Sequence, residues 1–230
     1  MKQNNLKLVV DKVFQNADKS VCVLGRLEEG ELQAGDVLTL RTQLPFLMPI
    51  EDVFSITGRG TVVTGRVESG VLCEGDELQI VGLGVSLRTF CVGIEQFRKL
   101  KEQCKAGENV GIIVRGVDKL QIKRGMVLTV SNEVKAYSEF TADCRVLQHT
   151  GKDYLKLLQE NGILKFVFRT AVLAGKFTIV EGKDALQPGD ELKMKITLEK
   201  PVVMHNGFAF SVLTRKDDVL LAGVVTNVLK

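Results

Sequence analysis

The chain has 230 residues, and hydrophobic residues make up 45% of it, which excludes a disordered polymer and predicts well-formed hydrophobic cores. Its 31 Lys and Arg residues stand against 28 Asp and Glu residues, and the formal charge of +3 is too small to indicate nucleic-acid binding by itself. No apolar run approaches the roughly 18 residues that a membrane helix needs, and no cleavable signal sequence is apparent. We therefore expect a soluble, cytoplasmic protein with no membrane partner.

Cysteine and histidine usage argues against disulfides and metal sites. The five cysteines are Cys22, Cys73, Cys91, Cys104 and Cys144. Their number is odd and no pair has C-x-x-C spacing, so we expect reduced, buried thiols that act as small hydrophobes. His149 and His205 lie far apart in the sequence, each without a cysteine at zinc-motif spacing. The sequence thus predicts no metal site.

An internal repeat opens the chain. Val10–Leu40 and Ile50–Ile80 align without a gap at an offset of 40 residues, and eleven of the 31 positions are identical. The identical pairs are Val13/Val53, Phe14/Phe54, Val23/Val63, Gly25/Gly65, Arg26/Arg66, Glu28/Glu68, Gly30/Gly70, Leu32/Leu72, Gly35/Gly75, Asp36/Asp76 and Leu38/Leu78. Because apolar positions and turn glycines coincide, both copies are expected to fold alike locally.

The first copy stops near Thr42, so residues 1–44 are predicted to form only half of a β-barrel. A half-barrel leaves open strand edges, which are prone to pairing with other strands unless something covers them. The third domain, the complete barrel that follows and a second chain are all candidates for covering these edges, and the sequence does not discriminate between them.

The second copy begins the most informative stretch of the chain, Pro49–Asp76. Its β-branched and aromatic residues suit two half-buried strands, and Gly58-Arg59-Gly60 supplies the backbone freedom that a hairpin turn needs. Before this stretch, Gln43–Met48 is expected to be a junction in which Pro45 breaks any strand.

β-Rich segments continue to about residue 130, so residues 45–130 are predicted to form a complete barrel. The later strands are expected at Glu77–Val81, Val81–Leu87, Thr89–Ile94, Asn109–Val114 and Val127–Val130. Between them, Phe97–Lys105 (FRKLKEQCK) is predicted to be a basic loop or a single helical turn.

Residues 131–230 read as a further β domain, entered through a linker at Ser131–Ser138. Its strands are expected at Phe140–Gln148, Lys165–Thr170, Gly175–Val180, Glu191–Pro201, Ala209–Thr214 and Leu220–Val228, with turns at Gln187–Asp190 and His205–Gly207. Lys152–Glu160 is the one helix signal, ended by Asn161-Gly162. The predicted fold class is all-β, with an N-terminal half-barrel, two antiparallel barrels and one short helix.

Four motifs of the first complete barrel carry a resemblance to a known family. They are PIEDVFSITGRGTVVTGRVESGVLCEGD, GIEQFRKL, AGENVGIIVRGV and IKRGMVL, and they resemble the second domain of bacterial elongation factor Tu. FVFRTAVLAGKF, QPGDELKMKITLEKPVVMHNGFAFSV and LLAGVVTNVLK resemble the third domain of the same family. The resemblance covers Pro45–Lys230 and implies two translation-factor-type β-barrels, at 45–130 and 131–230.

The catalytic machinery of that family has no counterpart in this sequence. No G-x-x-x-x-G-K-[ST] loop is present to cradle phosphates, and no Asn-Lys-x-Asp motif is present to read guanine. Gly58-Arg59-Gly60-Thr61 lacks both the spacing and the lysine of such a loop. We expect no GTP binding, no catalytic residues, no cofactor and no enzyme activity.

The resemblance implies a site for the aminoacylated 3′ end of transfer RNA on the second-domain barrel. The matching residues are Asp52, Phe54, Glu95, Arg98, Asn109 and Ile113. A carboxylate such as Glu95 can accept a hydrogen bond from a base or ribose hydroxyl, Arg98 can stack on or pair with the terminal nucleotide, and Ile113 can wall a base pocket. The alternative interpretation is that these residues are retained rim groups of a stable barrel.

Four arginines, Arg59, Arg66, Arg115 and Arg169, are further candidates for contact with a partner domain or RNA. Arg66 has a repeat mate in Arg26, next to a matching Glu28/Glu68 pair, which favours a structural salt bridge at the barrel rim. In the third domain, HTGKDYLKLLQENGILKFVFRT departs from the pattern of the family, in which this region contacts transfer RNA and the nucleotide-exchange factor.

Two functions remain open from the sequence. The first is a non-enzymatic translation module that binds aminoacyl-tRNA, the ribosome, or a GTPase or exchange-factor protein. The second is a protein-interaction or decoy module that engages elongation factor partners through open barrel edges. The oligomeric state is not indicated by the sequence.

Overall fold

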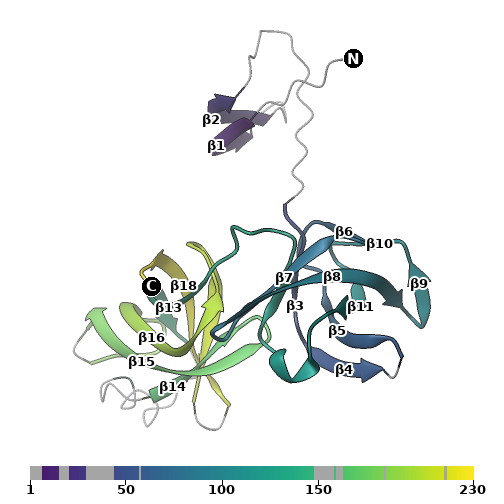
Figure 1. Ribbon diagram of the computed structural model, residues 1–230. Helices are drawn as coiled ribbons and strands as arrows, with labels where there is room; N and C mark the ends of the chain where they lie inside the picture. The colour runs from purple at the N-terminus through teal and green to yellow at the C-terminus, as the bar shows by residue number, and fades with distance from the viewer. Residues whose placement is uncertain are drawn as a thin grey trace. The chain divides into compact units, whose positions relative to one another are not determined.

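The computed structural model describes residues 7–15, 21–29, 44–56, 58–147, 158, 163–183, 185–214 and 217–230. Nearly all regular structure in these ranges is antiparallel β-strand, which confirms the predicted all-β class (Figure 1). The chain divides into two compact units, Met1–Thr42 and Gln43–Lys230.

The first unit contains a single described hairpin, in which β1 (Lys7–Gln15) pairs with β2 (Val21–Glu29). Val13 lies opposite Val23, and Phe14 lies opposite Cys22. The hairpin of the second copy pairs the same positions displaced by 40 residues, with Val53 opposite Val63 and Phe54 opposite Val62. The two copies therefore share one hairpin register. Residues 30–43, the rest of the predicted half-barrel, lie outside the described residues.

The second unit begins with an eight-stranded antiparallel sheet in the order β3-β12-β7-β8-β11-β5-β4, with β9 paired to β8. Its strands are β3 (Leu47–Pro49), β4 (Asp52–Ile56), β5 (Gly60–Arg66), β7 (Glu77–Gly82), β8 (Val85–Gln96), β9 (Lys99–Lys101), β11 (Asn109–Arg115) and β12 (Val127–Thr129). Separately, β6 (Val71–Cys73) pairs with β10 (Gln103–Lys105), and Lys119–Gln121 forms a 3-10 turn.

The sheet rolls up around a core because β3 approaches β5. A Cβ atom on Gly65 would lie 2.1 Å from the carbonyl oxygen of Pro49, so only glycine fits at this point of β5. The Glu51 N–H donates to the Thr64 carbonyl at 2.8 Å, and the Leu47 N–H donates to the Ser69 carbonyl at 3.1 Å. These contacts enclose a core that includes fully buried Met48, Ile80, Ile94 and Ile112, all at 0% exposure.

Three predicted boundaries in this sheet are wrong. Leu47 and Met48 belong to strand β3 rather than to a junction, and Pro49 is tolerated there because β3 lies at the edge of the described sheet, next to β12. Val81–Leu87 is not one strand, because Leu83 and Gly84 turn the chain between β7 and β8. Phe97–Lys105 is not a loop or helical turn, since it contains β9 and β10.

The remainder of the second unit forms a closed six-stranded barrel in the order β13-β16-β15-β14-β17-β18. Its strands are β13 (Ala136–Val146), β14 (Ile163–Phe168), β15 (Ala171–Glu181), β16 (Glu191–Val203), β17 (Ala209–Leu213) and β18 (Val219–Val228), each close to a predicted strand. Phe168 stacks on Phe210 at 5.0 Å and meets Phe140 edge-on at 5.6 Å in the core. The predicted helix Lys152–Glu160 lies outside the described residues except for Leu158, which is buried.

Arg169, at the turn between β14 and β15, joins the rolled sheet to the closed barrel. Its Nε donates to Glu68 Oε2 at 2.7 Å, one terminal nitrogen donates to the Val203 carbonyl at 2.7 Å, and the guanidinium lies 4.1 Å from the ring centre of Phe208. The predicted Arg66–Glu68 salt bridge is not the one that forms here. Because the Arg169 side chain is only 9% exposed, its bonds are largely shielded from water.

We predict that Arg169→Ala lowers the free energy of unfolding by about 2 kcal/mol, because it removes charge-assisted hydrogen bonds from a largely buried position. Arg169→Lys should not restore stability, since an ammonium group cannot form the same forked and stacked contacts. Urea denaturation measures the change. Arg66→Ala, at an exposed position on β5 of the rolled sheet, is the control and should stay within about 0.5 kcal/mol of the parent. If Arg169→Ala left the free energy of unfolding unchanged, the contact would not stabilise the fold.

Three of the four cysteines with described side chains are buried, as predicted, but Cys73 is exposed. Burial raises the pKa of the Cys91 thiol to about 11 and that of the Cys104 and Cys144 thiols to about 12. These three thiols therefore stay protonated and unreactive at neutral pH.

We predict that iodoacetamide at about pH 8 alkylates Cys73 in the folded protein, because Cys73 is exposed to the reagent. Cys91, Cys104 and Cys144 should react only after denaturation. Peptide mass mapping reads each cysteine separately. Rapid labelling of Cys91 or Cys144 in the native protein would contradict this core packing.

Candidate functional site

Four neighbouring strands, β4, β5, β11 and β8, carry most of the predicted site residues on one face. Phe54 on β4 lies opposite Val62 on β5, Val62 lies opposite Ile113 on β11, and Ile113 lies opposite Gly93 on β8. Directly opposed residues of antiparallel strands point to the same face of a sheet. Phe54 and Ile113 therefore belong to one row across four strands.

A second row follows two residues further along each strand. Asp52 lies opposite Thr64, Thr64 opposite Gly111, and Gly111 opposite Glu95. Since side chains alternate with a period of two, this row shares the face of the first.

A third row, again two residues on, pairs Arg66 with Asn109. The pairing thus brings together five of the six residues predicted to bind the transfer RNA end. We call them the site face: Asp52, Phe54, Glu95, Asn109 and Ile113.

Glycines shape the middle of the site face. A Cβ atom on Gly93 would lie 3.2 Å from Cδ1 of Ile113, and one on Gly111 would lie 3.4 Å from Cγ1 of Val62. The missing side chains therefore let Ile113 lie over Gly93 as an apolar floor. Phe54 stands at the β4 side of this floor with 48% of its surface exposed. Apolar surface in this arrangement can receive a flat ring or an aliphatic group.

The electrostatics of the site face depend on Glu95 and Arg59. Arg59, in the turn between β4 and β5, places its guanidinium 3.8 Å from a carboxylate oxygen of Glu95. The two side chains are 58% and 30% exposed, so the pair is screened by water and a ligand can displace it at little cost. Arg59 and Arg115 also line one depression of about 630 Å³, together with Lys119.

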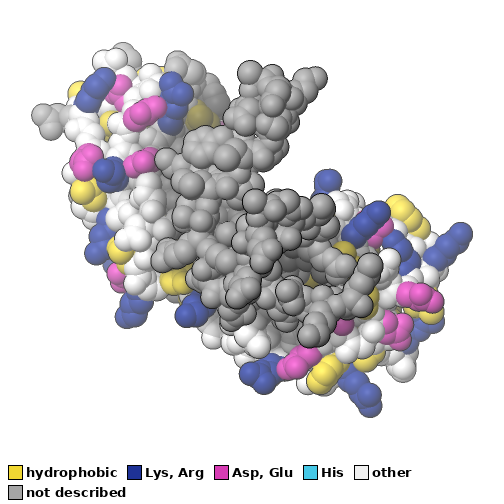
Figure 2. Space-filling model, turned by 90° about the horizontal axis from the view of Figure 1, so that it is seen from above, with side chains coloured by type: hydrophobic (Ala, Val, Ile, Leu, Met, Phe, Trp, Pro, Cys, Tyr) yellow, Lys and Arg dark blue, Asp and Glu magenta, His cyan; other side chains and the backbone are white. Residues whose placement is uncertain are grey.

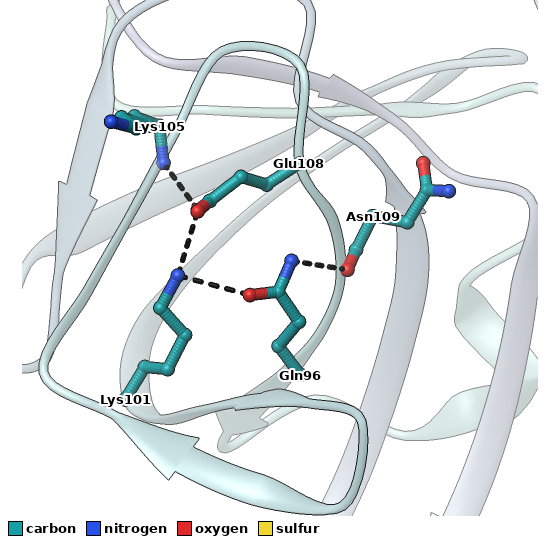
Figure 3. A network of polar contacts seen from close by, with 5 residues as sticks. All are labelled: Gln96, Lys101, Lys105, Glu108 and Asn109. Atoms are coloured by element: carbon teal, nitrogen blue, oxygen red, sulfur yellow. Dashed lines mark hydrogen bonds and ion pairs between the residues drawn. The ribbon is translucent and has the colours of Figure 1, made fainter.

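A network of polar contacts adjoins the site face at Asn109 (Figure 3). The Lys101 ammonium donates to Glu108 at 2.7 Å and to the Gln96 side-chain oxygen at 3.1 Å, while the Gln96 amide donates to the Asn109 carbonyl at 3.3 Å. The network thus ties the β8–β9 hairpin to the start of β11. Sequence reasoning missed Gln96, Lys101 and Glu108, because it treated the segment around Lys101 as a loop without strand partners.

The Lys101 ammonium and the Lys105 backbone N–H both bind the Glu108 carboxylate and lower its pKa. A depressed carboxyl pKa adds stability above its ordinary value of 4.5, and that stability is lost as pH falls through the folded-state pKa. We predict that Glu108→Gln makes the unfolding midpoint in urea less dependent on pH below 4.5. Glu102→Gln, at a nearby exposed carboxylate, is the control. If the unfolding midpoint of Glu108→Gln fell with decreasing pH as steeply as that of the parent, the network would have no stabilising role.

Several predicted residues lie away from the site face or have another contact. Arg98 lies in the β8–β9 turn, and Arg169 lies in the contact between the two barrels rather than on the site face. The Asp52 carboxylate accepts the N–H of Val53 at 2.8 Å, so it covers a donor on an edge strand. The structure thus gives Asp52 a local role that does not need a ligand.

Beyond the site face, a depression of about 950 Å³ on the closed barrel includes Arg145, Glu181 and Lys193 in its lining. Figure 2 shows Lys and Arg side chains interspersed with Asp and Glu over the visible described parts rather than collected in one basic area. No group of three His, Cys, Asp or Glu side chains among the described residues is arranged to hold a metal ion. Within the same ranges, no helix has the length and apolarity to cross a membrane.

Comparison with protein families supplies an independent finding. Residues 60–129 match the family model of elongation factor Tu domain 2. The match runs from β5 to β12 and includes Glu95, Arg98, Asn109 and Ile113, whereas Asp52 and Phe54 precede it. This part of the chain is therefore an elongation factor Tu-like β-barrel domain.

Proposed function

We propose that this protein is a non-enzymatic, translation-factor-like module whose site face binds the aminoacylated 3′ end of transfer RNA. The observation that supports this most is the strand pairing that brings Asp52, Phe54, Glu95, Asn109 and Ile113 into three consecutive rows of one face. A barrel needs neither this clustering of polar groups around an apolar floor nor an exposed phenylalanine for its own stability.

The chemistry of the site face suits the end of an RNA strand. The terminal adenosine offers a flat base, which can lie on the apolar surface of Ile113 and Phe54, and ribose hydroxyls, which can donate to the Glu95 carboxylate. Arg59 would then move from Glu95 toward a phosphate. The Asn109 side chain can both donate and accept, so it suits the ester or amino group of an esterified amino acid.

The rest of the chain also favours a role in translation. The closed barrel of β13–β18 carries the motifs that resemble the third domain of elongation factor Tu, and we propose that it is the equivalent of that domain. We propose that a GTPase acts together with these two domains. The ribosome, a GTPase and an exchange factor are the protein and RNA partners that this proposal suggests, in the cytoplasm.

A protein-interaction or decoy function is the second candidate, and the open edge of β4 favours it. Among the described strands β4 pairs only with β5, and it exposes Phe54 and Ile56 by 48% and 38%. An extended segment of a partner could add to such an edge by strand pairing. In that case aminoacyl-tRNA would bind no more tightly than the deacylated form.

We predict that the protein binds aminoacyl-tRNA in preference to the deacylated form, and that Glu95→Ala and Asn109→Ala each weaken binding about tenfold through loss of a hydrogen bond. Fluorescence titration at low and moderate salt measures the affinity, since phosphate contacts weaken with salt whereas site-face contacts do so less. Glu77→Ala, at an exposed carboxylate on β7, is the matched control.

Equal affinity for the two forms of transfer RNA would reject the proposed site. The proposed site would also be rejected if Glu95→Ala and Asn109→Ala left aminoacyl-tRNA binding unaffected while a change at the β4 edge abolished it. Binding of a translation protein without any RNA affinity would support the second candidate instead.

A further inference from the structure

The β1–β2 hairpin of the first unit is a near copy of the β4–β5 hairpin of the rolled sheet. Their residue numbers differ by 40 and their register is the same, since Val13 lies opposite Val23 just as Val53 lies opposite Val63. Two hairpins with one register offer their residues in the same order along the outer edge of the second strand. The edge of β2 can therefore be compared with the edge of β5 position by position.

The outer edge of β5 is occupied by β11. Six pairs of residues join the two strands, from Arg66 opposite Asn109 to Thr61 opposite Val114. Among the described strands, by contrast, β2 pairs only with β1. A hairpin of two strands is marginally stable by itself, and further strands stabilise it. The described part of the first unit thus has the edge with which β11 pairs, and no third strand on it.

The sequence of β2 suits β11 at all six positions. Three residues are identical in the two strands, namely Val23, Gly25 and Arg26. The three that differ are Val21, Cys22 and Leu24, where β5 has Thr61, Val62 and Thr64. None of these replacements brings a charge or a proline into the strand. Leu24 is larger than Thr64, but the residue opposite is Gly111, which has no side chain to displace.

The tightest point of the β5 position requires a glycine. Any side chain at residue 65 would collide with the Pro49 carbonyl oxygen, so the strand that fills this place needs a glycine there. β2 has one at the matching position, Gly25. Glycine otherwise weakens the interior of a strand, because it loses more conformational entropy than other residues and has no side chain to pack. Gly25 is thus a feature that the β5 position needs and that a hairpin alone does not.

We propose that the β1–β2 hairpin of one chain takes the place of β4–β5 in the rolled sheet of a second copy, so that two chains form a hairpin-exchanged dimer. The incoming hairpin re-forms the strand pairing that the displaced one gives up, so the exchange has little net cost and depends on protein concentration. A reciprocal exchange closes the dimer with two-fold symmetry. The proposal is independent of any RNA binding.

The exchange changes the site face as well as the oligomeric state. In the exchanged sheet, Lys12 takes the position of Asp52 and Phe14 takes that of Phe54. An aromatic residue is kept, while the charge at the first position is reversed. The monomer and the exchanged dimer therefore have two different versions of one face, and dilution converts the second into the first.

A disulfide cross-link tests the exchange, because the chain already has a cysteine at the position that matches Val62. In the exchanged dimer Cys22 lies opposite residue 113, at a spacing that a disulfide can bridge. Ile113→Cys, treated with diamide as the oxidant, should therefore give a peptide that joins residues 22 and 113. Mixing labelled and unlabelled chains before oxidation should show by mass spectrometry that the bond joins two chains.

Two control variants make the cross-link interpretable. Val62→Cys with Ile113→Cys and Cys22→Ser should cross-link within one chain, because these residues are opposed in the β5–β11 pair. Val114→Cys, one residue along β11 and on its other face, should give no bond to Cys22. If the first control cross-links and Ile113→Cys gives no bond to Cys22, or gives it only within single chains, the proposal is overturned.

Sedimentation velocity over a range of concentrations provides a test without cross-linking. The parent should pass from monomer to dimer as its concentration rises. Gly25→Ala should favour the strand conformation of β2 and yet prevent dimerisation, because its Cβ atom would collide with the Pro49 carbonyl. Leu24→Thr, which copies the β5 residue, is the control and should still dimerise. A parent that stays monomeric, or a Gly25→Ala variant that dimerises like the parent, would reject the exchange.

The outcome is distinguishable from that of the proposed function. A hairpin-exchanged dimer that binds no RNA would uphold the exchange and reject the proposed function. A monomeric protein that prefers aminoacyl-tRNA would uphold the proposed function and reject the exchange.

Discussion

The close approach of Gly65 to Pro49 is the constraint on which the rest of the rolled sheet depends. Any side chain at residue 65 would collide with the Pro49 carbonyl oxygen, because a Cβ atom would lie 2.1 Å away. The contact holds β5 against β3, and β5 is in turn the strand on which β4 and β11 pair. The three rows of the site face thus depend on this glycine. Its counterpart in the repeat is also a glycine, Gly25, and β1–β2 keeps the register of β4–β5.

Five non-glycine residues in the described ranges have a positive φ, namely Leu83, Phe97, Arg98, Arg169 and Asp217. A non-glycine residue in the left-handed region costs on the order of 1–3 kcal/mol, which is comparable with one or two good hydrogen bonds. Leu83 and Arg169 recover that cost through contacts that join the rolled sheet to the closed barrel. Phe97 and Arg98 do not recover it within the described part of the molecule.

The strands were largely predictable from the sequence because alternation is strong in segments such as β16 and β18, where buried and exposed residues follow one another. The five residues of the site face could be chosen only by resemblance. Their clustering depends on cross-strand register between β4, β5, β11 and β8, which no local pattern encodes.

The sequence-based predictions that were wrong share one physical cause, namely contacts between residues that are far apart in the sequence. The Leu83 turn lies within an apolar stretch, and its partner Pro201 is more than a hundred residues away. Glu68 has Arg66 as a plausible local partner, yet it binds Arg169, which is distant in sequence but close in space. Strands of three residues, such as β9 and β10, are too short to show a period in a basic segment.

The most direct test of the account is a methyl NMR titration with aminoacyl-tRNA and, in parallel, with the deacylated form. The methyl groups of Ile113, Val62 and Ile56 report on the site face and its edge, and Ile196 reports on the core of the closed barrel. Binding at the site face predicts that aminoacyl-tRNA shifts the first three signals, that the deacylated form shifts them less, and that Ile196 is unaffected. Binding that shifts only signals of the closed barrel, or that shifts Ile113 equally with both forms, would contradict it.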